Sequence, residues 1–145
     1  IQYLNFISDI YGVGKEQRNE LIIKYAALFE LTDNLGDIVS SYSHGMKQKL
    51  VIIGALVHKP RLLVMDEPFV GLDPKATYSM KEIMRDICAE GGAIFFSTHV
   101  LEVAEKLCNK IAIIKGGRLV ANGDTQDVIG NESLEETFLE LYNEK

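Results

Sequence analysis

The 145-residue sequence has no long apolar run, no cysteine framework and no cluster of lysine and arginine. Its longest apolar run, residues 50–57, is far shorter than the roughly 20 residues of a transmembrane helix. The scattered cations and the net charge of −6 argue against nucleic acid as a partner. Cys88 and Cys108 form neither a CxxC pair nor part of a zinc site, so we predict reduced core thiols in a cytosolic protein.

The spacing of apolar residues predicts an α/β fold. Helical spacing predicts helices over residues 1–11, 16–31, 43–57 and 74–90. Short apolar runs at residues 62–65 and 93–97 predict strands that are buried on both faces. Because a helix lies between these two strands, we expect a parallel sheet, while the purely helical start predicts a separate lobe.

Local signals place several element ends. Ser43 is predicted as the N-cap of a helix, and Asp73 as an N-cap followed by proline at the first helical position. Residues 111–114 and 118–121 flank a Lys-Gly-Gly turn, which predicts a β-hairpin. Ser133 stands three residues before a glutamate, which predicts a capping box for the last helix.

Two adjacent carboxylates, Asp66 and Glu67, directly follow the first predicted strand. Open α/β sheets bind ligands at the carboxyl ends of their strands. Because side chains alternate along a strand, one carboxylate could hold a metal while the other addresses a water. Mg²⁺ suits this arrangement, since it takes one or two carboxylates and keeps several waters. The alternative is a pair of solvated acids at a strand end.

A histidine, His99, follows the second predicted strand after Ser97 and Thr98. If the two strands are neighbours in one sheet, His99 lies near Asp66 and Glu67. Its imidazole could then hydrogen-bond a phosphate oxygen or an attacking water. The alternative is a histidine with a purely structural hydrogen bond.

The stretch SYSHGMKQKL, residues 41–50, places Ser43 and Gly45 at a helix start. The unpaired N–H groups and the dipole of such a terminus accept a phosphate readily. Gly45 would also let a ligand approach the backbone closely. The alternative is a plain N-cap on a core helix.

Taken together and in this order, the stretches resemble the ATP-binding subunit of ABC transporters. SYSHGMKQKL resembles the signature motif, LLVMDEP the Walker B strand, FVGLDPKA the D-loop and STHVLEVAE the switch-histidine region. SHGMKQ is most similar to bacterial exporters of the ABC-2 type. The resemblance implies an incomplete P-loop NTPase-type (RecA-like) α/β fold, with a parallel sheet flanked by helices. It also implies an α-helical signature subdomain at residues 1–58 and the C-terminal half of the ATPase core at residues 59–145.

Catalytic roles follow from the resemblance for residues that end the two strands. Glu67 would be the general base that polarises the attacking water. Asp66 would hold Mg²⁺, and His99 would contact the γ-phosphate of ATP. The parent protein would therefore be an ATPase that uses ATP and Mg²⁺.

A second set of residues would complete the site of the opposite subunit. Ser43 and Gly45 would bind the γ-phosphate of an ATP held there, and Asp73 would reach across the dimer. His44 and Met46 stand where the family's signature has glycine and glutamine, and they belong to the same nucleotide-binding segment.

The chain lacks other family motifs. It contains no G-x-x-x-x-G-K-[ST] loop, no aromatic adenine platform and no Q-loop glutamine. We therefore expect the C-terminal part of an ATPase subunit, which is inactive alone.

The resemblance implies a transmembrane permease subunit and a second nucleotide-binding subunit as partners, and a peripheral, cytoplasmic location at the inner face of the cell membrane. The alternatives are a soluble ABC-type ATPase without a transporter, a non-catalytic interaction module, and an α/β domain with chance motifs.

Overall fold

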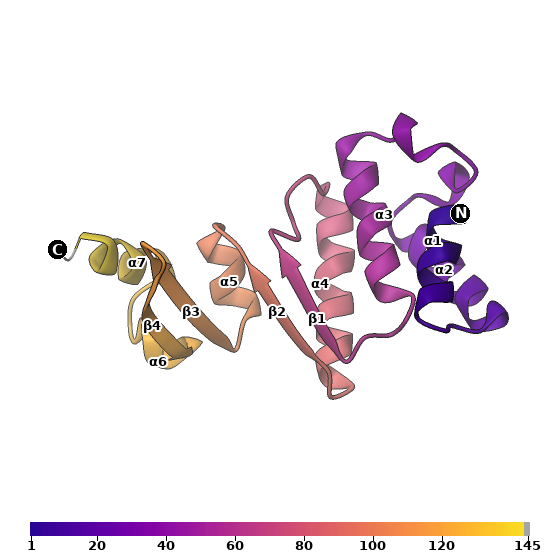
Figure 1. Cartoon of the computed structure of the whole chain (residues 1–145). Helices are drawn as coiled ribbons and strands as arrows, with labels where there is room; N and C mark the ends of the chain where they lie inside the picture. The colour runs from indigo at the N-terminus through magenta and orange to yellow at the C-terminus, as the bar shows by residue number, and fades with distance from the viewer. Residues whose placement is uncertain (144–145) are drawn as a thin grey trace. The chain divides into compact units, whose positions relative to one another are not determined.

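The computed structural model describes residues 1–143, and these form two compact units. The boundary between the units lies between Phe96 and Ser97 (Figure 1). The predicted division after residue 58 falls inside the first unit and stays a prediction. Among the described residues, no helix combines the length and the apolar character needed to cross a membrane.

The first unit begins with helices, as the sequence predicts. They are α1 (Gln2–Ile10), α2 (Lys15–Leu28) and α3 (His44–Leu56), with two short 3₁₀ turns, η1 (Thr32–Asn34) and η2 (Val39–Ser41), between α2 and α3. Both α1 and α2 contact α3. The enclosed core between them includes Leu4, Ile22, Phe29 and Ile53, each at most 1% exposed.

The rest of the first unit contains β1 (Leu62–Asp66), α4 (Pro74–Ala89) and β2 (Ala93–Ser97), of which the last residue is assigned to the second unit. The two strands are hydrogen-bonded neighbours and run in the same direction (Figure 1). This arrangement confirms the predicted α/β fold with a parallel sheet. Met80 on the inner face of α4 is completely buried.

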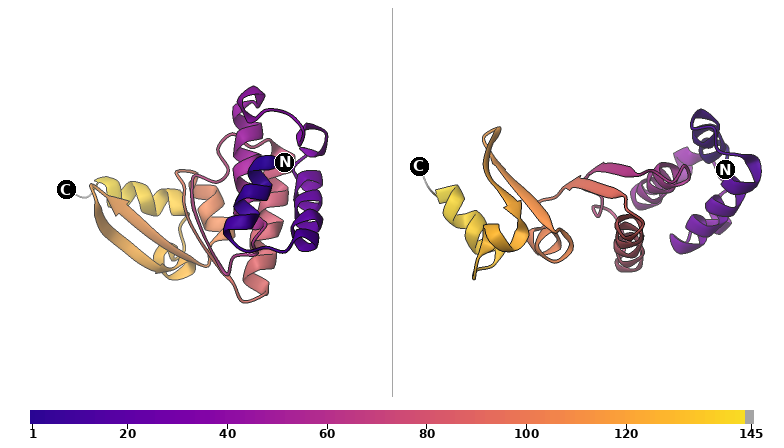
Figure 2. Two further views of the ribbon diagram at one scale, coloured as in Figure 1. Left: turned by 45° about the vertical axis from the view of Figure 1, so that its right-hand side comes forward. Right: turned by 90° about the horizontal axis from the view of Figure 1, so that it is seen from below.

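The prediction that these strands are buried on both faces is wrong. Leu63 is 6% exposed, whereas Leu62, Val64 and Phe95 are 60%, 64% and 64% exposed. Burial therefore alternates along each strand, as it does when only one face of a sheet is covered. Figure 2, in its right-hand view, shows α4 on one side of the two strands. Burial of both faces requires helices on both sides of the sheet. In the first unit, helix α4 covers one face of the two strands.

The second unit is built around the predicted hairpin. It contains α5 (Leu101–Leu107), β3 (Lys110–Lys115), β4 (Arg118–Asp124), α6 (Thr125–Ile129) and α7 (Leu134–Asn143). β3 and β4 pair in antiparallel fashion, with a register shift between Ile113 and Ile114. The hydroxyl of Thr125 donates to the carbonyl of Cys108 at 2.7 Å, which ties the start of α6 to the end of α5.

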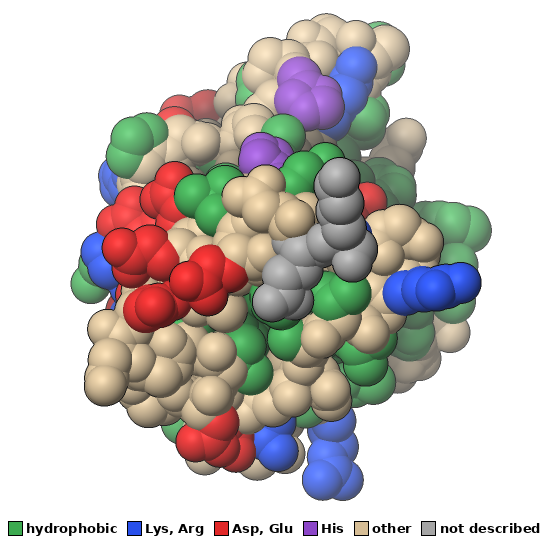
Figure 3. Space-filling view, turned by 90° about the vertical axis from the view of Figure 1, so that its left-hand side faces the viewer, with side chains coloured by type: hydrophobic (Ala, Val, Ile, Leu, Met, Phe, Trp, Pro, Cys, Tyr) green, Lys and Arg blue, Asp and Glu red, His purple; other side chains and the backbone are tan. Residues whose placement is uncertain are grey.

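The predicted capping box at the last helix is confirmed. The Ser133 N–H and hydroxyl both donate to the Glu136 carboxylate at 2.9 Å, and the Glu136 N–H donates to Ser133 Oγ at 3.2 Å. The bonds from the Ser133 N–H and hydroxyl, in that order, lower the pKa of Glu136. Four acids of this segment are exposed, namely Glu132, Glu135, Glu136 and Glu140. Figure 3 shows several acidic side chains on the face that it draws.

The two cysteines are unbonded, but they are not both core residues. Cys108 is half-buried, and its burial raises the pKa of its thiol. Cys88 is exposed near the end of α4, so the predicted core position is wrong for this residue. The buried residues of this helix are Ala76, Met80, Ile83 and Met84, all before its last turn, which contains Cys88.

Candidate functional site

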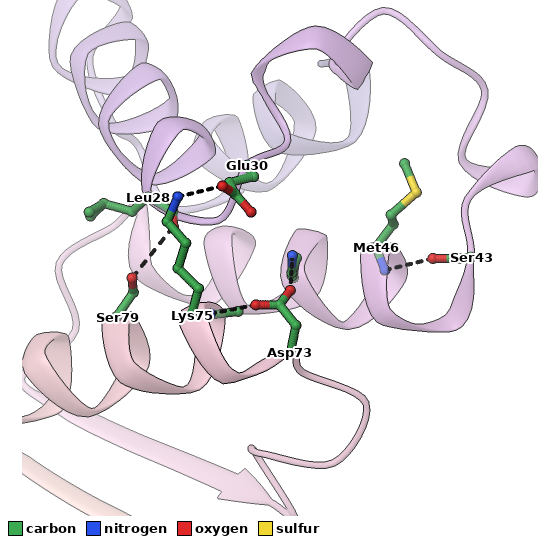
Figure 4. A network of polar contacts seen from close by, with 9 residues as sticks. Leu28, Glu30, Ser43, Met46, Asp73, Lys75 and Ser79 are labelled. Carbon is green, nitrogen blue, oxygen red and sulfur yellow. Dashed lines mark hydrogen bonds and ion pairs between the residues drawn. The ribbon is translucent and has the colours of Figure 1, made fainter.

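The start of α3 has the geometry that the sequence predicts. Ser43 is the N-cap, and its Oγ accepts a hydrogen bond from the Met46 N–H at 3.2 Å (Figure 4). Ser43 and His44 are both exposed. The N–H groups of a first helical turn point away from the helix, so this end of α3 offers donors and partial positive charge at the surface.

The first turn of α3 packs directly on the loop that follows β1. A methyl group placed on Gly45 would lie 2.7 Å from the carbonyl oxygen of Gly71. A methyl group on Gly71 would lie 2.9 Å from Cδ2 of His44, and Gly71 has a φ of +80°. Gly45 therefore allows the backbone of α3 to pack closely against the backbone of the loop at Gly71. This packing requires a glycine whether or not a ligand also binds there.

Substitution of Gly45 should destabilise the fold although it lies in a helix. Alanine in place of glycine in a helix normally stabilises by about 1 kcal/mol. Here the new methyl group meets a backbone oxygen, and overpacking of this kind costs about 1–3 kcal/mol. We expect Gly45→Ala to lower the free energy of unfolding, measured in urea.

A matched glycine serves as the control for this substitution. Gly36 has no atom within 4 Å of an added methyl group, so Gly36→Ala should leave stability unchanged or slightly raised. Equal stability of the Gly45→Ala and Gly36→Ala variants would show that the close contact carries no strain.

Asp73 joins the start of α4 to α3. Its Oδ1 accepts from the Ala76 N–H at 2.8 Å, which confirms the predicted N-cap (Figure 4). Its Oδ2 lies 2.5 Å from Nζ of Lys49, whose side chain is only 12% exposed. The hydrogen bond from Lys49, followed by that from the Ala76 N–H, lowers the pKa of Asp73 below its ordinary value of 3.8.

Acid should release this contact. Because the folded-state pKa of Asp73 is below the unfolded value of 3.8, its contribution to stability is complete above that value and is lost as the pH falls through the folded pKa. We expect the midpoint of thermal unfolding to fall less steeply for Asp73→Asn than for wild type as the pH is lowered below 3.8. Parallel curves for the two proteins would contradict the assignment.

A second polar contact fixes the first turn of α4. Lys75 forms an ion pair with Glu30, just beyond α2 (Figure 4), and this pair raises the pKa of Lys75. Ser79 Oγ also lies 3.5 Å from the carbonyl oxygen of Leu28. Together with Asp73, these contacts attach the beginning of α4 to the helical part of the first unit.

The two carboxylates stand at the end of β1 in different backbone conformations. Asp66 is the last strand residue and is exposed, whereas Glu67 is half-buried with a φ of +46°. The left-handed region costs a non-glycine residue about 1–2 kcal/mol. Because Glu67 lies outside β1, the alternation of side chains along a strand does not determine where its carboxylate points.

Glu67 differs from the other non-glycine residues with positive φ. Glu30 and Lys59 follow helices, where a left-handed residue is a common way to end the helix. Glu67 follows a strand, and its carbonyl accepts from the Val70 N–H at 3.1 Å, so it begins the loop toward α4. Strain at a carboxylate beside a strand end is typical of functional sites.

The donor set at this strand end fits magnesium better than zinc. Among residues 1–143, no group of three His, Cys, Asp or Glu side chains could hold a metal ion by itself. Carboxylate oxygens are hard ligands, and Mg²⁺ needs only one or two of them because it completes its shell with water and phosphate oxygens. A cavity of about 250 Å³ between α3 and β1 extends to Asp66.

The predicted histidine lies in the second unit. His99 is exposed and follows β2 directly after Thr98, whose Oγ1 accepts from the Val100 N–H at 3.1 Å. β1 and β2 are neighbours in one sheet, and the prediction that His99 lies near the two acids depends on this pairing. The approach of His99 to Asp66 and Glu67 stays a prediction.

Lys49 and Gly71 are the residues of this region that sequence reasoning missed. The lysine occupies an ordinary position on a polar helix face, and nothing in the sequence links it to Asp73. Gly71 carried a signal, because a glycine before Leu-Asp-Pro suggests a turn with positive φ. Only the fold reveals that Gly71 contacts the signature-like segment and that Lys49, within that segment, pairs with Asp73.

Comparison with known proteins places the chain in a family. A family model described as "AAA domain, putative AbiEii toxin, Type IV TA system" matches residues 7–105. An uncharacterized ABC transporter ATP-binding protein of Synechocystis is 32% identical over 140 residues, which are 95% of this chain and 40% of that protein. The Nod factor export ATP-binding protein I of Rhizobium etli is 34% identical over 135 residues, or 93% of this chain and 42% of that protein.

A solved structure agrees with these relatives. The structure titled "Structure of ATP binding subunit of ABC transporter" superposes with a TM-score of 0.91 at 34% identity, covering 97% of this chain and 60% of that one. The chain thus spans about 40% of the length of the curated relatives it matches. It carries an AAA-type domain and belongs to the family of ABC transporter ATP-binding proteins.

Proposed function

We propose that this chain supplies the water-activating half of an ATP hydrolysis site in a dimeric ABC transporter ATPase. The observation that carries the proposal is the strained backbone of Glu67 directly beside Asp66 at the end of a parallel strand. Phosphoryl transfer depends mainly on positioning and on neutralisation of charge. A backbone held in an unfavourable conformation at Glu67 is suited to the first task, and a metal-binding carboxylate at Asp66 to the second.

The residues at the strand ends have separate roles in this proposal. Glu67 accepts a proton from the water that attacks the γ-phosphate. Asp66 binds Mg²⁺, which neutralises charge on the phosphates when it is present. His99, the second residue after β2, donates a hydrogen bond to the γ-phosphate.

The start of α3 acts on the ATP of the other subunit. Ser43 and Gly45 present a capped helix terminus to the γ-phosphate, with His44 and Met46 in the same turn. Asp73 contributes from the loop in contact with this turn, and in the dimer it would couple the two sites.

The wider role is export through a transmembrane permease subunit. Export is favoured by the relatives from Rhizobium etli and Cupriavidus metallidurans, whose names describe them as Nod factor export ATP-binding proteins. The protein would then lie on the cytoplasmic face of the membrane and bind there to the permease.

ATP hydrolysis should require a phosphate-binding loop in addition to this chain. The 145 residues contain no G-x-x-x-x-G-K-[ST] loop, since the stretch GVGKEQ lacks both the spacing and the Ser or Thr, so the β-phosphate lacks its cradle. We expect calorimetry to detect no tight ATP binding to the chain alone, and phosphate release to stay at background.

A longer polypeptide in which such a loop precedes this chain should bind and hydrolyse ATP. The parent domain with its own loop is the appropriate protein, and a variant with its loop lysine replaced is the negative control. Tight stoichiometric binding of ATP by the 145-residue chain would contradict the proposal. Hydrolysis that is absent even with the loop present would contradict it as well.

A further inference from the structure

Two contacts hold the loop between β1 and α4 against α3. The imidazole of His44 lies on Gly71, where an added methyl group would come within 2.9 Å of Cδ2. The ammonium group of Lys49 lies 2.5 Å from the Asp73 carboxylate. The Lys49 side chain is 12% exposed and that of Asp73 is 43% exposed, so solvent reaches the ion pair mainly from the Asp73 side.

The same loop begins at Glu67. The Val70 N–H donates to the Glu67 carbonyl at 3.1 Å, and the Leu72 N–H donates to the Phe69 carbonyl at 3.2 Å. Asp73 ends the loop by capping α4. The loop therefore begins at Glu67, whose backbone is strained, and its other end is attached to α3 through Asp73.

We propose that His44 and Lys49 are positioning residues, which hold this loop so that Glu67 keeps its orientation and moves together with the start of α3. The role of Glu67 rests on the proposed function, but the two contacts do not. The proposal also explains a histidine at position 44: its ring fills the space over Gly71 that a glycine would leave open.

The first test measures the loop in the 145-residue chain. Lys49→Met and His44→Gly should each speed amide hydrogen exchange at Val70 and Leu72, for Lys49→Met on the order of tenfold, as expected for loss of one charged hydrogen bond. Lys49→Arg should restore slow exchange, because it keeps the charge and the reach. Lys47→Met, an exposed position on the same helix, is the control.

Exchange at Val70 and Leu72 that stays at the wild-type rate in both variants would overturn the proposal. Faster exchange throughout the chain in Lys49→Met would indicate global unfolding. In that case the exchange rates of the milder variant, His44→Gly, test the proposal. Faster exchange confined to the loop in His44→Gly supports the proposal, and unchanged exchange there overturns it.

The second test measures turnover in the longer polypeptide with a phosphate-binding loop. Misplacement of a reacting group by about 1 Å can cost up to about 10²-fold in rate, so Lys49→Met should lower kcat within that range with KM unchanged. Lys49→Arg should recover most of the rate. A merely structural lysine would not separate kcat from KM in this way.

The outcomes distinguish this inference from the proposed function. If Glu67→Gln loses turnover while Lys49→Met keeps the wild-type kcat, the positioning role is wrong and the proposed function stands. If Glu67→Gln keeps turnover, the proposed function fails, and faster exchange at Val70 and Leu72 would still establish that the two side chains hold the loop.

Discussion

Glu67→Gln should lower the kcat of ATP hydrolysis by about 10²–10⁴-fold, the usual effect of removing a general base. The measurement belongs in the polypeptide that also carries the phosphate-binding loop. Glutamine keeps the size of the side chain and its hydrogen-bonding reach but cannot accept the proton of the attacking water. Binding of ATP should stay close to that of wild type, because the substitution leaves the phosphate contacts in place.

The backbone of Glu67 makes this substitution informative. Its φ of +46° is a property of the loop and not of the carboxylate, so glutamine inherits the same strain. A loss of turnover with unchanged thermal stability would therefore report on chemistry and not on folding. Glu20→Gln, an exposed position on α2, is the matched control, and it should hydrolyse ATP at the wild-type rate.

Turnover of Glu67→Gln at more than about a tenth of the wild-type rate would remove Glu67 from the mechanism. The remaining candidate in this unit would be Asp66, with Glu67 reduced to a loop residue. A fall in kcat together with a large rise in KM would indicate instead that Glu67 contributes mainly to binding of the substrate.

Sequence reasoning succeeded where the determining interactions are local. The caps at Ser43 and Asp73 and the capping box of Ser133 with Glu136 each depend on groups three residues apart. Such contacts are encoded in a short stretch and survive in most folds. The order of the strands and of α4 was equally accessible, because the period of the apolar pattern changes between them.

The errors and omissions arise from long-range structure. Leu62, Val64 and Phe95 form continuous apolar runs with their neighbours, and such runs are typical of strands covered on both sides. The pattern cannot tell whether covering helices are present in the same unit. In the same way, the contact of Lys49 with Asp73 depends on how α3 packs against the loop. The positive φ at Glu67 was also not predictable, because glutamate is not a residue type that favours this conformation.

The family resemblance supplied roles that local patterns cannot. Two adjacent acids at a strand end can also be interpreted as solvated carboxylates without a function. The strain at Glu67 now favours the functional reading, since a purely solvated residue has no need of a conformation that costs about 1–2 kcal/mol. The positive φ of Glu67 is a backbone property that the sequence pattern does not encode.

Phe29→Ala should lower the free energy of unfolding by about 3–5 kcal/mol, the range for removal of a fully buried phenylalanine. Phe29 is 0% exposed and ends α2, where its N–H donates to the Tyr25 carbonyl at 3.0 Å. Glu30 follows it and pairs with Lys75 at the start of α4. A cavity at Phe29 therefore weakens the helical core and the attachment of α4 together.

The control for Phe29→Ala is Phe6→Ala on α1, whose ring is 61% exposed. Surface substitutions usually change stability by no more than about 0.5 kcal/mol, so urea unfolding should separate the two variants clearly. Small domains are stable by only about 5–15 kcal/mol, and the loss at Phe29 would remove a large part of that margin. Similar midpoints for the two variants would mean that the helical core does not unfold together with the rest of the first unit.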